Sequence, residues 1–227
     1  ILMITRDALF SHRLRLAAVG VQVDAFSRRY WLTFRGALYF PPEAGALRMA
    51  LLQLATTSQR DRDRPIIVAL SCKSYGKAIT SKGHMKPICE RADQAFAESP
   101  PYIDLLNTTF ALVAEGRQPM TYRLDEAMAA GVVPVFASAE PFVRPFSQLI
   151  EWDSISLTVS PDRIAQLPEM LSSMPRSAVR TMQAGVRRVY REYLEPNAAR
   201  SSFYKLLRQR AKRRARGSHH AMGRVSD

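Results

Sequence analysis

Charged and small residues gather between two apolar runs in the stretch EGRQPMTYRLDEAMAAG, which covers residues 115–131. Gly116 allows the backbone to approach a ligand closely, and Thr121 is well placed to cap a helix that begins beside it. The free N–H groups of that first turn attract anions, and Arg117 and Arg123 lie on either side of it. Two guanidinium groups beside free amides suit a diphosphate, because they can contact several of its oxygens at once. The pattern predicts a diphosphate-binding helix start.

Two acids in the same stretch keep a second interpretation open. Glu126 lies one turn into the helix, where its carboxylate can accept hydrogen bonds from the hydroxyls of a sugar or ribose. Asp125 and Glu126 also complement the helix dipole without any ligand, and Arg123 could pair with an acid nearby. The stretch is neither a P-loop nor a Gly-x-Gly-x-x-Gly turn. Spacing alone therefore does not decide between a ligand site and an ordinary helix start.

The elements that would position this site alternate along the chain. Short apolar runs predict strands over 30–36, 65–71, 110–116 and 132–137, and helical spacing predicts helices over 45–57, 100–109 and 121–130. Gly131 predicts the stop of the third helix. Alternating strands and helices with short connections favour an α/β fold, a Rossmann-like parallel sheet with right-handed crossovers.

The rest of the chain predicts helices only. Prolines and capping residues mark helix starts for segments 160–174 and 175–194, and a loop is expected over the stretch that carries both cysteines. We expect a remnant of a preceding domain or linker over 1–27, one α/β domain over 28–194, and a basic helical tail with a disordered end over 195–227.

The net charge of +13 suits a nucleic-acid or anionic-polymer binder, but much of the excess follows Phe203 in the tail. A terminal basic run is typically a solvated tail, and aromatic residues do not alternate with these charges as single-strand stacking requires. No apolar run approaches the roughly 20 residues of a membrane span. The first residue is not Met and lies in an apolar run, so the chain is expected to begin in the middle of a longer protein.

The sequence gives only weak indications of a metal site or of thiol chemistry. Cys72, Cys89 and the intervening His84 do not match a zinc site, and the two cysteines can be free thiols or a disulfide. Asp61 and Asp63 form an Asp-x-Asp pair of the kind that holds manganese, yet they precede a strand where such sites normally follow one. A solvated turn is the preferred interpretation, and we expect no metal.

The order of motifs resembles the C-terminal half of exostosin-type glycosyltransferases. TYRLDEAMAAGVVPVFAS and PFSQLIEW are similar to that family's Arg-containing Glu-Ala helix, Pro-Val strand and Pro-Phe-Ser-x-x-Ile-x-Trp motif. RRYWLTFRG, CKSYGK and LLNTTFALVAEGR are similar to its strand ending in Phe-Lys-Gly, its cysteine loop and its Asn-x-Thr-Phe segment. The resemblance extends to VRRVYREYL and covers most of the chain.

This resemblance implies the donor-binding domain of a GT-B enzyme, which consists of two facing Rossmann-like domains. Arg48, Arg117, Arg123 and Glu126 match family positions expected to hold a UDP-sugar. With Gly116, Thr121 and Tyr122 they form the candidate donor site. The resemblance further implies inverting transfer to a glycan or polysaccharide acceptor without a metal or another cofactor. Glucuronic acid is the first expectation for the sugar, and galactose, xylose and arabinose are the alternatives. The catalytic base is not identified.

The resemblance also implies a setting. It favours the Golgi lumen, with a type II membrane anchor outside this chain. It also implies no nucleic-acid partner and allows a homo- or hetero-dimer. It favours a Cys72–Cys89 disulfide. Asn107 begins an N-glycosylation sequon, although an Asn that ends a helix explains it equally well.

The sequence departs from the family at three places. Ala111 stands where many members have Cys, Ala114–Glu115 replaces a Pro-containing pair, and Arg144 occupies an apolar position. These departures bear on the identity of the donor. The alternatives are a polyanion-binding module, a dehydrogenase that lacks the expected glycine fingerprint, and a fragment that binds UDP without catalysis.

Overall fold

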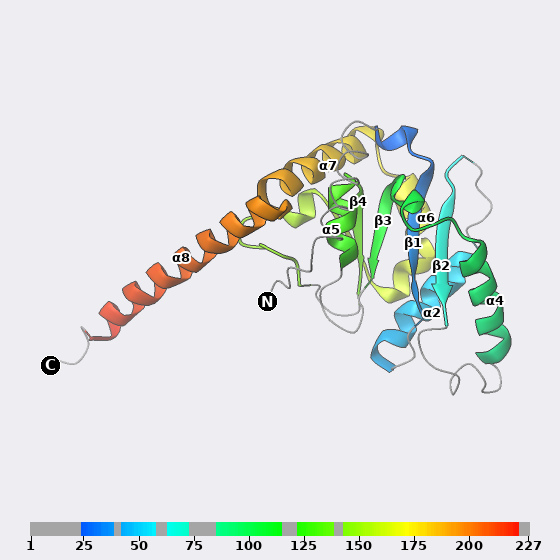
Figure 1. The fold of residues 1–227 in the computed structure, drawn as a ribbon, viewed down its shortest axis with the longest axis horizontal. Coiled ribbons are helices and arrows are strands. Elements are labelled where there is room, and N and C mark those ends of the chain that lie inside the picture. Colours follow the sequence, from blue (N-terminus) through cyan, green and yellow to red (C-terminus); the bar gives the residue numbers. More distant parts are fainter. Residues whose placement is uncertain are drawn as a thin grey trace.

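The computed structural model describes residues 24–38, 42–57, 63–72, 85–114, 122–138 and 143–222. Within these residues the chain forms one five-stranded sheet in the order β2-β1-β3-β4-β5, and every neighbouring pair is parallel (Figure 1). The strands are β1 (Tyr30–Ala37), β2 (Ile66–Ser71), β3 (Thr108–Ala114), β4 (Val133–Ala137) and β5 (Leu157–Val159). The predicted Rossmann-like α/β sheet is confirmed.

An α-helix lies in each connection between β1, β2, β3 and β4, as crossovers between parallel strands usually need. The α-helices are α2 (Pro42–Thr57), α4 (Met85–Glu98), α5 (Tyr122–Ala129), α6 (Leu167–Ser172), α7 (Arg176–Val189) and α8 (Pro196–Met222). Short 3₁₀ segments are η1 (Ala25–Ser27), η3 (Asp104–Leu106), η4 (Trp152–Ser154) and η5 (Pro161–Gln166), and a π-helical segment, η6 (Tyr190–Leu194), precedes α8. The long helix α8 projects away from the sheet domain (Figure 1).

The core lies around the central strands. Every residue of β3 and β4 is buried, and Phe110 and Phe136 are fully enclosed. Such continuous apolar runs are expected of parallel strands covered on both faces. Trp152 lies edge-on to Phe136, with the ring centroids 5.8 Å apart. β3 and β4 thus form a fully buried base for the loops at their carboxyl ends.

Helix α5 ends where the sequence predicts. Gly131 has a left-handed φ of 64°, and the Val132 N–H donates to the Ala127 carbonyl at 2.9 Å. This is the hydrogen bond of a Schellman cap, which needs a residue that tolerates positive φ. The expected Gly131 stop is confirmed, and it turns the chain directly into β4.

Arg28 stabilises the end of the sheet at which β3 and β4 begin, opposite to their carboxyl ends. Its guanidinium donates to the carbonyls of Leu106 at 3.1 Å, Ala130 at 2.8 Å and Gly131 at 3.2 Å. Burial, and then the neighbouring charge of Arg187, lower the pKa of Arg28 to about 10. One side chain therefore satisfies carbonyls from the connections on both sides of β3.

Several expected elements differ in the structure. The region after Pro145 contains β5 as well as helices, and segment 85–98, expected as a loop, is the helix α4. The helix expected over 100–109 is reduced to η3, because the β-branched, buried Thr108 and Thr109 already belong to β3. The helix expected over 160–174 divides into η5 and α6, and α7 ends at Val189 rather than Leu194.

Candidate functional site

The strand order creates a crevice between β1 and β3. The chain passes from β1 to β2 on one side and then crosses to β3 on the other, so the connections after β1 and β3 diverge. In open α/β sheets, ligands bind at this switch point, beyond the carboxyl ends of the strands. Gly36 lies at the end of β1, and α5 begins at Tyr122 after β3.

Two of the predicted arginines meet over one aromatic ring at this edge. The Cζ atoms of Arg48 and Arg123 each lie 5.0 Å from the centroid of the Phe34 ring. Arg48 comes from α2 and is only 3% exposed, whereas Arg123 comes from the first turn of α5. Guanidinium groups are attracted to the negative face of such a ring, which also restricts their orientation. The structure therefore brings together two cations from distant parts of the sequence.

Tyr102 connects Arg123 with the predicted acid Glu126. The Arg123 Cζ lies 5.1 Å from the centroid of the Tyr102 ring, and the Tyr102 hydroxyl is hydrogen-bonded to the Glu126 carboxylate. Burial raises the pKa of Tyr102 first, the negative charge of Glu126 raises it further, and Arg123 opposes the shift. The phenol therefore stays protonated and donates a hydrogen bond to the Glu126 carboxylate. Sequence reasoning missed Tyr102, although its place after two prolines and before η3 could have indicated it.

A hollow of about 410 Å³ opens beside Arg123. Its lining residues come from the ends of β1 and β2, from α4 and from α5: Arg35, Gly36, Ala37, Ser71, Phe96, Tyr102 and Arg123. The volume lies in the range of pockets that hold small molecules. The predicted set did not include the residues of this hollow other than Arg123.

Arg35 forms one wall of the hollow. Its Cζ lies 3.8 Å from the centroid of the Phe96 ring, and its guanidinium donates to the carbonyls of Ser99 at 3.2 Å and Pro100 at 3.0 Å. Burial, and then the positive charge of Arg123, lower the pKa of Arg35. The charged residue in the otherwise apolar strand YWLTFRG was the signal that could have identified it.

A disulfide and one aspartate fasten the α4 side of the hollow. Cys72, directly after β2, is bonded to Cys89 of α4, with their Cα atoms 5.5 Å apart. Asp93 accepts hydrogen bonds from the Ser71 hydroxyl and from the Cys72 N–H, both at 2.8 Å. These links hold α4, and with it Phe96, against the end of β2.

Three predicted site residues, Gly116, Arg117 and Thr121, lie outside the described residues. Tyr122 is the first residue of α5, and its side chain is 55% exposed. Asn107 is exposed and follows η3 directly, with its side-chain oxygen 3.4 Å from the Arg29 N–H. Of the predicted site residues, Arg48, Arg123 and Glu126 form one described cluster.

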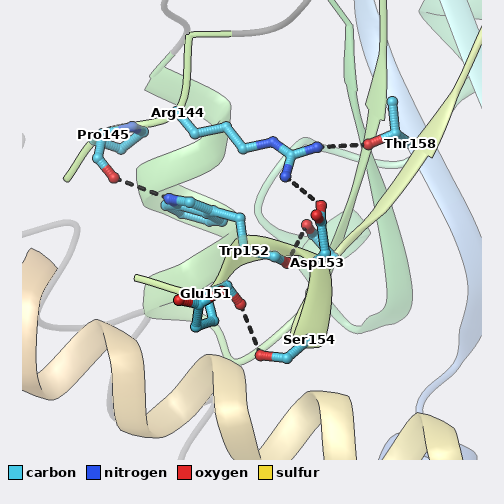
Figure 2. A network of polar contacts seen from close by, with 8 residues as sticks. Arg144, Pro145, Glu151, Trp152, Asp153, Ser154 and Thr158 are labelled. Atoms are coloured by element: carbon cyan, nitrogen blue, oxygen red, sulfur yellow. Dashed lines mark hydrogen bonds and ion pairs between the residues drawn. The ribbon is translucent and has the colours of Figure 1, made fainter. Parts of the chain in front are cut away.

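Arg144, the unusual residue after β4, belongs to a different polar network (Figure 2). It forms an ion pair with Asp153 at 2.6 Å, donates to the Thr158 hydroxyl at 2.7 Å, and lies over the Phe136 ring. The adjacent Trp152 indole donates to the Pro145 carbonyl at 2.9 Å. Arg144 thus links the loop after β4 to Asp153 and to Thr158 of β5.

The described residues contain no group of three or more His, Cys, Asp or Glu side chains arranged to hold a metal ion. Of the Asp-x-Asp pair, only Asp63 is described. Among the described helices, none combines the length and apolar character of a membrane span.

Comparisons with known proteins find exostosins among the relatives of this chain. The exostosin-1 homolog of Caenorhabditis elegans is 28% identical over 168 residues, which are 74% of this chain and 41% of that protein. Exostosin-1 of Drosophila melanogaster is 25% identical over 183 residues, 79% of this chain and 23% of that protein. The chain thus spans less than half the length of either relative.

A solved structure, the C-terminal domain of a group 1 family glycosyl transferase from Francisella tularensis, is 14% identical with a TM-score of 0.49 and covers 79% of this chain and 98% of that one. The model of the Exostosin GT47 domain matches residues 22–174, which include every described strand and the whole Arg48–Arg123–Glu126 cluster. This chain belongs to the exostosin GT47 family.

Proposed function

We propose that this chain is the donor-binding domain of a glycosyltransferase that uses a UDP-sugar. The observation that carries the proposal is the cluster at the switch point of the sheet, where Arg48 and Arg123 share the Phe34 ring and Tyr102 holds Glu126. We assign the domain to residues 28–194, with a remnant of the acceptor domain before it and the basic tail after it.

In this proposal the arginines hold the diphosphate. Arg123 in the first turn of α5 and Arg48 in α2 contact the phosphate oxygens, aided by Gly116, Arg117 and the helix start at Thr121 and Tyr122. Glu126 accepts hydrogen bonds from the ribose hydroxyls, since Tyr102 already fixes its carboxylate. The hollow beside Arg123 then receives the nucleoside end of the donor.

The proposed transfer inverts the anomeric carbon. A base deprotonates an acceptor hydroxyl, whose oxygen attacks the anomeric carbon as the bond to the diphosphate oxygen breaks and UDP departs from the opposite face. The arginines and helix amides stabilise the charge that develops on the leaving diphosphate, at about 3 kcal/mol for each well-placed donor. Because the protein supplies this positive charge, we propose that the transfer needs no metal. The base is not among the residues that we assign.

Family resemblance supports the finer proposals. It favours glucuronic acid as the sugar, a growing polysaccharide as the acceptor, and the Golgi lumen with an anchor outside this chain as the setting. A disulfide at Cys72–Cys89 suits such an oxidising compartment. The isolated chain is expected to bind the donor without turnover if the acceptor domain supplies the base.

Calorimetric titration with UDP, UDP-glucuronic acid, UDP-galactose and UDP-xylose, with EDTA present, tests the proposal. We expect micromolar UDP binding that Arg123→Ala weakens about 10- to 100-fold, the loss expected for hydrogen bonds to a charged group. Arg188→Ala, on the exposed side of α7, is the matched control and should bind normally. The tightest sugar identifies the donor.

Two results would contradict the proposal. One is the absence of UDP binding by a chain that circular dichroism shows to be folded, and the other is equal binding by the Arg123→Ala variant. Binding that requires manganese and disappears in Asp61→Ala would instead identify the Asp-x-Asp pair as a metal site.

A further inference from the structure

The helix α8 carries a concentration of positive charge that the donor site does not use. Between Pro196 and Met222 it contains eight Lys or Arg residues and no Asp or Glu. Its first turns pack against the domain through Ala199, Ser202 and the partly buried Leu206. Beyond these contacts the helix extends away from the sheet (Figure 1). No acidic side chain of α8 itself can neutralise these cations.

Part of this charge lies on one face of the helix. A shallow hollow of about 450 Å³ is lined by Ser201, Tyr204, Lys205, Arg208, Gln209 and Lys212. Residues separated by three or four positions share a helix face, so the three cations form a row with Tyr204 beside them. We call Tyr204, Lys205, Arg208 and Lys212 the basic stripe. The Tyr204 side chain is 57% exposed.

We propose that the basic stripe binds an acidic polysaccharide, a polymer of uronic-acid residues, and so holds the acceptor polymer away from the donor site. This inference rests on the proposed transferase function. Lys205 and Lys212 are about 10 Å apart along the helix axis, at 1.5 Å per residue. Cations repeated over this length can pair with carboxylates repeated along an extended sugar chain. Tyr204 supplies a ring face against which the C–H groups of a sugar can pack.

Two other anionic partners fit the structure less well. A nucleic acid matches the charge, but the Cys72–Cys89 disulfide is typical of oxidising compartments outside the cytosol and nucleus. An interfacial membrane helix has a broad apolar face opposite its charges. Among the described side chains of α8, Phe203 and Leu207 are the only large aliphatic or phenyl side chains that are exposed, and two such residues do not form a broad apolar face. A sugar polymer therefore fits best.

The test measures binding of fluorescent polygalacturonate to the full 227-residue chain at several salt concentrations. Lys205→Gln, Arg208→Gln and Lys212→Gln are combined in one variant. The matched control combines Arg91→Gln, Arg163→Gln and Arg188→Gln, which removes the same charge from three other exposed elements. We expect the stripe variant to bind at least 10-fold more weakly at low salt, with a smaller salt dependence, and the control to lose less than about 3-fold.

A second variant separates sugar recognition from charge. Tyr204→Ser should weaken binding of polygalacturonate about 5-fold and leave binding of inorganic polyphosphate unchanged, because polyphosphate has no sugar ring to pack on tyrosine. Neutral dextran should not bind. UDP titration of the same variants should be normal, which distinguishes failure of this inference from failure of the proposed donor site.

The inference is overturned if the stripe variant binds polygalacturonate as well as the control variant does. Equal effects of Tyr204→Ser on polygalacturonate and polyphosphate would also overturn it. Stripe-dependent binding to phosphatidylserine vesicles without polygalacturonate binding would assign the stripe to a membrane surface instead. Stripe-dependent self-association in sedimentation, again without polygalacturonate binding, would assign it to a second copy of the chain.

Discussion

The two cationic regions of this chain hold their charges in different ways. At the carboxyl edge of the sheet, Arg48 and Arg123 lie over the Phe34 ring, and Arg48 is almost fully buried. On α8, Lys205 and Arg208 extend from an exposed helix face. Side chains of equal formal charge therefore differ in burial: they are partly or almost fully buried at the carboxyl edge of the sheet and exposed on α8.

The difference predicts different binding behaviour. Charges that are desolvated and oriented by rings interact strongly with a ligand of matching geometry, and salt screens them weakly. Exposed charges on a helix contribute mainly through their sum, and salt screens them strongly. We expect selective binding of UDP at the sheet edge and salt-sensitive binding of polyanions on α8. The following predictions test this contrast.

The disulfide should matter for the sheet edge and not for α8. Replacing both Cys72 and Cys89 by Ser removes a cross-link between residues 17 positions apart, which should lower the free energy of unfolding by about 3 kcal/mol. UDP affinity should fall as well, because α4 carries Phe96 at the wall of the hollow. Chemical denaturation and calorimetry measure the two effects.

Polygalacturonate binding is the internal control for the double Cys→Ser variant, under conditions where it remains folded. Wild-type protein treated with dithiothreitol should behave like the variant. A similar loss of affinity for UDP and for polygalacturonate would contradict the separation of the two regions.

Gly36→Ala and Gly185→Ala form a matched pair of substitutions, because each adds a methyl group where neighbouring atoms leave too little room. A Cβ at Gly36 would lie 2.9 Å from the Phe34 Cζ and 3.5 Å from an Arg123 nitrogen, whereas a Cβ at Gly185 would lie 2.5 Å from the Ile155 Cγ2. Each Gly→Ala change should destabilise the fold by about 1–3 kcal/mol. Only Gly36→Ala should weaken UDP binding, by about 10-fold, since it displaces the ring beneath both arginines. Normal UDP affinity in Gly36→Ala would show that the Phe34 ring does not orient these arginines.

Tyr102→Phe should have a smaller and more selective effect. The change removes the hydroxyl that donates to Glu126, a hydrogen bond worth about 1 kcal/mol, so UDP should bind about 5-fold more weakly. Inorganic pyrophosphate, which has no ribose, should bind as it does to the wild type. Calorimetry with both ligands measures this, and an equal loss for both would indicate that Tyr102 acts through Arg123 instead.

The exposed ion pair of Arg180 with Asp24 is a third kind of setting for a cation, and its removal should have the smallest effect. The Asp24 carboxylate accepts a hydrogen bond from the Phe26 N–H and pairs with Arg180 at 2.9 Å; the first contact, then the second, lower its pKa below the ordinary 3.8. A lowered pKa stabilises the fold above pH 3.8, and this contribution is lost as the pH falls through the folded-state pKa.

Asp24→Ala should therefore lower the melting temperature slightly at pH 7, with a difference from wild type that disappears toward acid pH. Asp24→Asn, which can keep the hydrogen bond to Phe26, should show a smaller decrease at pH 7. A difference that persists unchanged below the folded-state pKa would exclude a charge effect.

The sheet was predictable from the sequence because its central strands are buried on both faces. The apolar runs at 30–36 and 132–137 are typical of strands in a buried parallel sheet, and both form strands in the structure. Segment 85–98 was not identified as a helix because few of its side chains are buried: Cys89 and Ala92 are its only buried members among those described. The three residues of β5 are too short a run to show periodicity.

The candidate site was predictable in part. A helix start with nearby arginines indicated Arg123 and Glu126, and family resemblance added Arg48. The ring of Phe34 and the hydroxyl of Tyr102 were not identified, because their role depends on a close approach in space between β1, α5 and the segment before η3. Tertiary contacts of this kind leave no local pattern in a single sequence.

The three-residue strand β5 has a consequence for solubility. It forms one edge of the described sheet, where unpaired N–H and C=O groups could recruit a strand from another molecule. Such a short edge offers few of these groups, and Arg144 holds the Thr158 side chain against the loop after β4. Sheet extension is therefore disfavoured at β5 even at high salt, where the mutual repulsion of molecules with a net charge of +13 no longer keeps them apart.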